Sequence, residues 1–372
     1  MEFQVTRARS FLAGGLALAE CVTPALSREV RLFAHGGLAI LDRIAALDFD
    51  VLRQRPRLSR WDKARLLWHF ATAGHERSAV RTVDSASALD RDYAYCEEVT
   101  RRSSSNFYYA FHLLPRDKRR ALCAVYAFCR FLDDVADRED PSWSPQASLQ
   151  RWRDEVEAVF HGSPRHPISR ALADAVRRFP LGERYFYELI EGVETDLSPR
   201  IYESWAELRQ YCYRVASTVG LLCIEIFGYR NPSARQYACD LGIAFQLTNI
   251  LRDVREDAER GRVYIPRADL LQFECSERDL LQGSYSPRVA ALLAFECGRA
   301  RGFYLRARAA LAPEDRRSLA AAEAMRLIYQ RLLARIEAQN FDVFQSRVTL
   351  PRYEKVSLAL AAWGRSQLHR AG

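Results

Sequence analysis

Apolar residues recur three and four positions apart along most of the chain, whereas the alternating pattern of a β-strand is scarce. Proline and glycine gather mainly between these periodic segments, as in "PSWSP" and "GSPRHP". The pattern predicts an all-α protein. No chemistry is legible near the N-terminus, so we expect residues 1–88 to be a helical extension of unknown role and residues 89–372 to form the main domain.

A first predicted helix carries a polar stripe beside an apolar face. It follows Pro115, which fits the first turn of a helix. Tyr126, Arg130, Asp133 and Asp137 are spaced four, three and four apart, so they share one face. Carboxylates at these spacings repel one another on a helix, and water or a cation must compensate the repulsion.

A second helix, "CDLGIAFQLTNILRDVREDAERG", repeats this design. Gly261 suits its end, and Pro266 bars any continuation. Its polar face combines amides with carboxylates, and a helix that lines a polar cavity in a bundle has this character. The residues of this face are Gly242, Gln246, Asn249, Asp253 and Asp257.

Two facing aspartate pairs suit a magnesium site. A single D-x-x-x-D pair is most often a solvated face, but two pairs on otherwise apolar helices favour a functional site. Carboxylate oxygens suit Mg²⁺, which binds through a few carboxylates together with substrate phosphates. The metal would turn a diphosphate into a leaving group, and Arg130 would contact the same oxygens. A di-iron site expects Glu-x-x-His pairs, and the sequence contains none.

Three other segments each leave two interpretations open. The aromatic residues of "RRSSSNFYYAFHLLP" could form a wall that stabilises a cation, or ordinary helix core. The small residues of "YCYRVASTVGLLC" could leave room for a chain-like ligand, although close helix packing is the safer interpretation. The arginines of "ERGRVYIPRADL" could close over phosphate or be surface charge.

Composition leaves the class of partner open. The formal net charge of +8 and the pI of about 9.1 suit phosphates, anionic lipid or nucleic acid. None of the nine cysteines forms a C-x-x-C pair, so a zinc or redox site has little support. The cysteines in apolar runs are expected to be buried thiols of a cytoplasmic protein. These are Cys123, Cys129, Cys212 and Cys223.

Membrane insertion is not expected, but contact with a membrane surface is. No apolar run reaches the length of a membrane span. Glu20 interrupts the apolar start of the chain and no clean cleavage site follows, so we expect no export. The basic and aromatic segment "RPRLSRWDKARLLWHF" could lie on an anionic membrane surface, or cap the main domain.

At these motifs the chain resembles the squalene/phytoene synthase family. The matching pieces occur in family order over roughly residues 90 to 365, and they include "SSSNFYYAFHLLP", "YAFCRFLDDVAD", "ELIEGVETDL", "YCYRVASTVG" and "QLTNILRDVREDAERGRVYIP". The resemblance implies an isoprenoid-synthase-type helical bundle with a deep central cavity. It also implies Mg²⁺-dependent, head-to-head joining of two allylic prenyl diphosphates.

The resemblance assigns roles residue by residue. Asp133 and Asp137 match the first aspartate-rich motif, and Asp253 and Asp257 match the second. Tyr211 matches a cavity tyrosine near the reacting carbons. The expected contacts with diphosphate, metal shell or prenyl chain are Ser104, Phe107, Phe111, Arg130, Gln246, Asn249 and Arg262. Some family members open the aromatic segment with His-Ser, where this chain has Ser103 and Ser104, so phosphate contacts from that histidine are in doubt.

Within the family, several products compete. The motifs look most similar to bacterial presqualene diphosphate synthases of hopanoid pathways, which join two farnesyl diphosphates. Phytoene synthases use two geranylgeranyl diphosphates, and squalene synthases add a reduction by NADPH. The non-enzyme alternative is a basic helical module that binds membrane or nucleic acid, and the intact aspartate pairs argue against it. We therefore expect a cytoplasmic prenyltransferase at the inner face of the cytoplasmic membrane, alongside other enzymes of its pathway and without nucleic acid.

Overall fold

The computed structural model divides the chain into two compact units, Met1–Ser85 and Ala86–Gly372. It describes single positions between 5 and 45, and residues 87–103, 111, 114–137, 144–197 and 200–368. The basic segment over residues 55–70 lies outside the described residues, so its predicted membrane contact stays a prediction. All helices named below belong to the second unit.

The second unit is helical, as the sequence predicts, and its described residues contain no strand. None of the described helices is long and apolar enough to cross a bilayer. The elements are α4 (Ala88–Arg102), α6 (Arg116–Asp137), α7 (Pro145–His161), α8 (Pro167–Arg178), α9 (Glu183–Glu194), η2 (Thr195–Leu197), α10 (Trp205–Cys212), η3 (Tyr213–Ser217), α11 (Thr218–Phe227), α12 (Ser233–Arg252), α13 (Val254–Glu259), α14 (Arg267–Gln272), α15 (Glu277–Leu281), α16 (Pro287–Ala310), η4 (Pro313–Asp315), α17 (Ala320–Ala338) and α18 (Arg352–Leu368).

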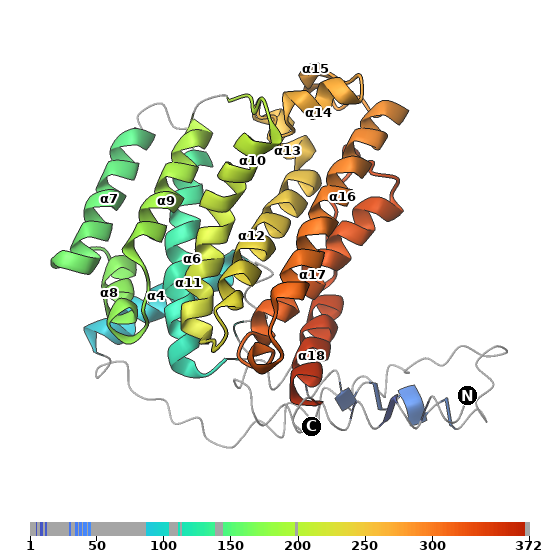
Figure 1. Ribbon diagram of the computed structural model, residues 1–372. Coiled ribbons are helices and arrows are strands. Elements are labelled where there is room, and N and C mark those ends of the chain that lie inside the picture. The colour runs from blue at the N-terminus through green and yellow to red at the C-terminus, as the bar shows by residue number, and fades with distance from the viewer. Residues whose placement is uncertain are drawn as a thin grey trace. The chain divides into compact units, whose positions relative to one another are not determined.

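Helix α12 lies at the centre of the unit and is buried along most of its length. It packs against α11, α16 and α17 (Figure 1). A helix that is surrounded by others has to be apolar on most sides, and Tyr237, Leu247 and Leu251 are almost fully buried. The short helices α13, α14 and α15 gather at one end of the bundle, the top in Figure 1, where α9 and α12 end and α10 begins.

Glycines let α12 approach the helix formed by α10, η3 and α11. A Cβ atom on Gly242 would lie 2.6 Å from Ser217 Cα, and one on Gly220 would lie 2.9 Å from the carbonyl oxygen of Ala238. Both distances are too short for a side chain. The contact on Ser217 falls in η3, a π-helical turn, and such turns often mark functional sites. These small residues therefore provide close packing, and Ala216 and Gly220 also line an internal cavity, so the two interpretations of the segment are compatible.

The second aspartate-rich helix differs from the sequence prediction. The sequence predicts one continuous helix, whereas the structure bends at Asp253, which separates α12 from α13. Hydrogen bonds still run from the Asp253 amide to the Asn249 carbonyl and from the Asp257 amide to the Asp253 carbonyl, both at 2.8 Å. The chain leaves α13 at Gly261, whose φ of 70° is a conformation that favours glycine.

Gly242→Ala tests the close approach of α12. The added methyl group meets backbone atoms that cannot move aside, so we expect the free energy of unfolding to fall by about 1–3 kcal/mol. Gly298 on α16 is the matched control, because its Cβ would meet nothing within 4 Å. Gly298→Ala should stabilise the helix by about 0.5–1 kcal/mol. Urea denaturation measures both values, and equal effects of the two substitutions would contradict the packing argument.

Arg299 on α16 bridges two buried acidic residues, Asp269 on α14 and Glu296 on its own helix. Arg299 donates from Nη1 to Asp269 at 2.8 Å and to Glu296 at 2.6 Å. Glu296 is only 1% exposed, and burial raises its pKa to about 8 even though the guanidinium of Arg299 opposes the shift. The Glu296 carboxyl group is therefore protonated in the folded protein at neutral pH.

Glu296 should make the protein less stable as the pH rises. The unfolded chain releases this proton near the ordinary glutamate pKa of 4.5, whereas the folded chain keeps it up to about 8. Stability is lost between those values, at up to roughly 1.4 kcal/mol per pH unit. Glu296→Gln carries no such proton, so it should gain stability over the wild type at about pH 8.5 but not at about pH 5. Thermal melting at both pH values checks this, and a constant difference would contradict it.

Candidate active site

A cavity of about 660 Å³ lies inside the bundle, a size typical of ligand pockets. Its lining runs from Leu122 to Asp133 on α6 and from Tyr237 to Arg252 on α12. At about 1.5 Å per residue, these stretches are roughly 16 and 22 Å long. The cavity is therefore long enough for a chain-like ligand.

The two ends of the cavity differ in chemistry. Along both helices, the charged and amide residues come last and the apolar residues come first. The polar end includes Arg130, Asp133, Asp196, Gln246, Asn249 and Arg252. The apolar end includes Leu122, Val219, Ile224, Phe227, Leu241 and Phe245. An anionic head group and an apolar tail would fit this arrangement.

The first aspartate-rich motif enters the cavity from α6. Asp133 is exposed and lines the polar end, as does Arg130, which forms an ion pair with Asp134 one turn further along. This pairing was not predicted, because Asp134 lies off the predicted stripe. The side chain of Asp137 lies outside the described residues, and so do Ser104 and Phe107.

The aromatic segment contributes Phe111, which is 4% exposed and lines the cavity. Its ring meets that of Tyr126 edge-on, with centroids 6.4 Å apart. The Tyr126 hydroxyl donates to Ser103 Oγ at 2.9 Å, and Ser103 Oγ donates to the Thr100 carbonyl at 2.7 Å. Ser103 thus links the start of this segment to α6 at the cavity wall.

The second motif begins with a heavily paired carboxylate. Arg252 Nε donates to Asp253 Oδ1 at 2.7 Å, and Arg347 Nε donates to the same oxygen at 2.9 Å. Burial raises the pKa of Asp253, but the Arg252 hydrogen bond and the Arg347 charge outweigh burial and leave it lowered. Arg252 and Arg347 line the cavity, whereas Asp253 does not. The two guanidinium groups therefore connect the Asp253 carboxylate to the cavity wall.

Asp257 and Arg262 lie in a small adjoining pocket with Tyr264. Burial and then the charge of Asp253 raise the pKa of Asp257 to about 7, against the opposing charge of Arg262. Asp196 contributes to the same shift. Three carboxylates from η2, the bend and α13 therefore repel one another at this end of the bundle.

Asp196 organises a cluster of tyrosines. It accepts hydrogen bonds from the hydroxyls of Tyr211 at 2.9 Å and Tyr264 at 2.8 Å. The rings of Tyr211 and Tyr264 stack with centroids 5.2 Å apart. Burial and the charge of Asp196 hold the pKa of Tyr211 well above its ordinary value, so the phenol stays protonated.

Two of the cysteines predicted to be buried line the cavity instead. Cys123 and Cys212 are buried as expected, whereas Cys129 and Cys223 are half-buried. The difference arises because the cavity exposes one side of their helices. Burial raises the pKa of all four thiols, so they are protonated at neutral pH.

The structure brings most described candidate residues to one cavity and adds others. The cavity is lined by Phe111, Arg130, Asp133, Tyr211, Gln246 and Asn249. Sequence reasoning assigned no role to Asp196, although its motif "ELIEGVETDL" was noted. It also missed Arg252, which is off the predicted stripe, and Arg347, which lies between α17 and α18 where no periodic pattern marks it.

The carboxylates and one amide fit a divalent cation. Among the described residues, no group of three or more acidic, histidine or cysteine side chains would hold a metal by itself. Asn249 Oδ1, however, is buried at the cavity without a hydrogen-bond partner in the described structure. This oxygen and the carboxylate oxygens of Asp253 and Asp257 are of the hard type that Mg²⁺ prefers.

Comparison with known proteins identifies the family. The sequence model of squalene/phytoene synthases matches residues 1–62 and 100–354, so it also extends into the N-terminal segment. A protein from Arthrospira platensis named phytoene synthase is 38% identical over 280 residues, covering 71% of this chain and 90% of that protein. Phytoene synthase from Mycobacterium bovis is 41% identical over 277 residues, covering 74% and 91%.

Solved structures support the same conclusion. A dehydrosqualene synthase in complex with a ligand superposes with a TM-score of 0.68 at 30% identity, covering 75% of this chain and 98% of that one. Squalene synthase HpnC from Alicyclobacillus acidocaldarius gives a TM-score of 0.62 at 30% identity, covering 68% and 95%. The bundle therefore has the fold that the motifs implied, and the chain belongs to the squalene/phytoene synthase family of prenyltransferases.

Proposed function

We propose that this protein joins two molecules of geranylgeranyl diphosphate head to head, as a phytoene synthase does. The observation that carries the choice of substrate is the identity to proteins named phytoene synthase, 34–41%, against 30% to the dehydrosqualene and squalene synthases. This replaces the sequence-based preference for two farnesyl diphosphates and presqualene diphosphate, which becomes the second candidate.

The polar end of the cavity would bind the diphosphates. Arg130, Arg252 and Arg347 line it and carry positive charge toward any bound anion. Asp133, Asn249, Asp253 and Asp257 would hold Mg²⁺. When bound, the metal neutralises the diphosphate and makes it a better leaving group.

The apolar end would shelter the reaction from water. The C–O bond of one substrate breaks to release diphosphate, and the resulting allylic cation is attacked by the double bond of the second substrate. A C–C bond forms, and loss of a proton closes a cyclopropane ring that still carries the second diphosphate. Departure of that diphosphate gives a second cation, which rearranges and loses a proton to leave a hydrocarbon. The faces of Phe111, Phe245 and Tyr329 line the cavity and would stabilise positive charge during these steps.

Tyr211 would act as a polar contact for the reacting carbons rather than as the base. Its hydroxyl already donates to Asp196, and the raised pKa of the phenol keeps it protonated. A protonated phenol offers oxygen lone pairs to a cation but does not store a second proton at neutral pH. The released diphosphate then remains as the acceptor of the proton.

The cellular setting follows from the substrate. Prenyl diphosphates and their hydrocarbon products partition into lipid, so a cytoplasmic enzyme in peripheral contact with the membrane, handing product to the next pathway enzyme, is the arrangement we propose. In a carotenoid pathway that next enzyme would act on a 40-carbon chain, and in a hopanoid pathway on a 30-carbon chain.

Product chain length is the direct test of the proposed function. Purified protein is incubated with Mg²⁺ and radiolabelled geranylgeranyl or farnesyl diphosphate, and the extracted hydrocarbons are identified by mass. We expect a 40-carbon product from geranylgeranyl diphosphate at the higher kcat/KM. A preference for farnesyl diphosphate would support the second candidate, and parallel reactions with NADPH would show whether reduction follows. Consumption of neither substrate would exclude the activity.

Asp133→Ala should abolish turnover without unfolding the protein. Asp133 is exposed, so its removal leaves no gap in the core, whereas its proposed metal contact is worth several kcal/mol of charge stabilisation. We expect kcat to fall by more than about a hundredfold. Asp117→Ala on the same helix is the control, because Asp117 lies at the far end of α6 and is 71% exposed. Turnover by Asp133→Ala above about a tenth of the wild-type value would contradict metal binding.

A further inference from the structure

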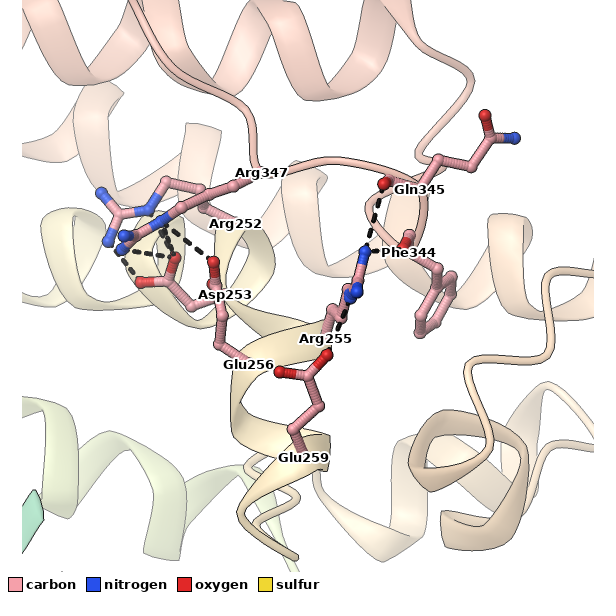
Figure 2. A network of polar contacts seen from close by, with 8 residues as sticks. All are labelled: Arg252, Asp253, Arg255, Glu256, Glu259, Phe344, Gln345 and Arg347. Atoms are coloured by element: carbon pink, nitrogen blue, oxygen red, sulfur yellow. Dashed lines mark hydrogen bonds and ion pairs between the residues drawn. The ribbon is translucent and has the colours of Figure 1, made fainter.

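Asp253 is fully engaged by two arginines (Figure 2). Arg252 places Nε 2.7 Å from Oδ1, and its Nη2 pairs with Oδ2. Arg347 places both Nε and Nη2 2.9 Å from the same oxygen, Oδ1. Arg347 Nε also lies 3.4 Å from Glu256. The carboxylate oxygen that faces Arg347 thus has both its lone-pair directions taken by guanidinium groups.

The backbone that carries Arg347 is anchored on both sides. Arg255 donates from Nη1 to the carbonyls of Phe344 and Gln345, each at 3.2 Å (Figure 2). Arg335 donates from Nη1 to the Thr349 carbonyl at 2.7 Å. Val348 beside Arg347 is 3% exposed, so the segment is held in place on the bundle. The 50% exposed side chain of Arg347 can therefore change position without moving the backbone.

The two arginines differ in how readily they can leave Asp253. Arg252 is 16% exposed and next to Asp253 in the chain, whereas Arg347 is 50% exposed and belongs to a distant segment. Arg347 also lines the cavity. If a cation took the Arg347 side of Asp253, like charges would repel, and Arg347 is the group that can turn away into the cavity.

We propose that Arg347 is a built-in counter-ion that competes with Mg²⁺ for Asp253 until a diphosphate enters the cavity and takes the guanidinium over. The proposal rests on the proposed function, because it assumes that Asp253 is a metal ligand. It explains why a protein with such clustered carboxylates keeps two arginines on one of them. Metal and diphosphate would then bind together, since each removes the partner that opposes the other.

Metal-binding calorimetry tests this without measuring activity. Mg²⁺ alone is titrated into wild-type protein, Arg347→Gln and the control Arg301→Gln, and each titration is repeated with inorganic pyrophosphate. Arg301 is 56% exposed and pairs with Glu337, so the control removes a comparable ion pair that does not involve Asp253. Arg347→Gln should fold, because Arg252 still pairs with Asp253. A thermal melt of the variant checks this. Arg347→Lys, which keeps the charge, provides a second variant.

We expect Arg347→Gln to bind Mg²⁺ alone at least about tenfold more tightly than the wild type or Arg301→Gln. The gain in Mg²⁺ affinity from pyrophosphate should shrink by a similar factor, and Arg347→Lys should stay near the wild type. An unchanged or weaker Mg²⁺ affinity of Arg347→Gln would overturn the inference. If Asp253→Asn also leaves wild-type Mg²⁺ binding unchanged, then the metal site itself is wrong and the proposed function fails with it. If Asp253→Asn abolishes Mg²⁺ binding but Arg347→Gln leaves the Mg²⁺ affinity at the wild-type value, then only the counter-ion role of Arg347 is lost.

Discussion

The burial of several carboxylates beside a few guanidinium groups, at one end of an apolar cavity, is the constraint on which the rest of the structure depends. Burial, together with the charges of Asp253 and Asp196, holds the pKa of Asp257 near 7. Such a cluster is costly to bury, and only a rigid frame keeps its members from moving apart into water. The long helix α12, which is buried along most of its length, and the helices packed on it provide this frame.

The same frame leaves a cavity that is polar at one end and apolar at the other. On one side of the cavity, the close approach at Gly242 brings α12 against the π-helical turn η3. Val215 and Ala216 of that turn line the cavity, so its wall is set by backbone contacts rather than by flexible side chains. A reaction through an allylic cation needs such a wall, because water that reached the cation would quench it.

Charge pairing links the site to segments that are remote in sequence. Arg347 follows α17 by several residues, yet its guanidinium lies on a carboxylate at the end of α12. Tyr264, which follows α13, shares Asp196 with Tyr211 of α10. The polar end of the cavity is therefore assembled from at least five separate stretches of chain, which explains why its chemistry is richer than the two aspartate motifs alone indicate.

Much of the site could be predicted from the sequence, for a physical reason. On a helix, positions three and four apart share a face, so the spacing of Arg130 and Asp133, and of Gln246 and Asn249, placed each pair on one wall of a cavity. The apolar residues beside them predicted that the helices are packed inside a bundle. The ordered motifs then identified the family, which the comparisons confirmed.

What the tertiary structure alone decided is which groups meet across helices. Periodicity gives the face of a residue but not its partner on another segment, so it did not show that Arg347 holds Asp253 or that Asp196 accepts hydrogen bonds from two tyrosines. The bend at Asp253 is also invisible in the pattern, because both halves keep the same spacing. Ion pairs between distant segments depend on how helices are placed in space, and that placement is set by the packing of the whole core rather than by any local stretch of sequence.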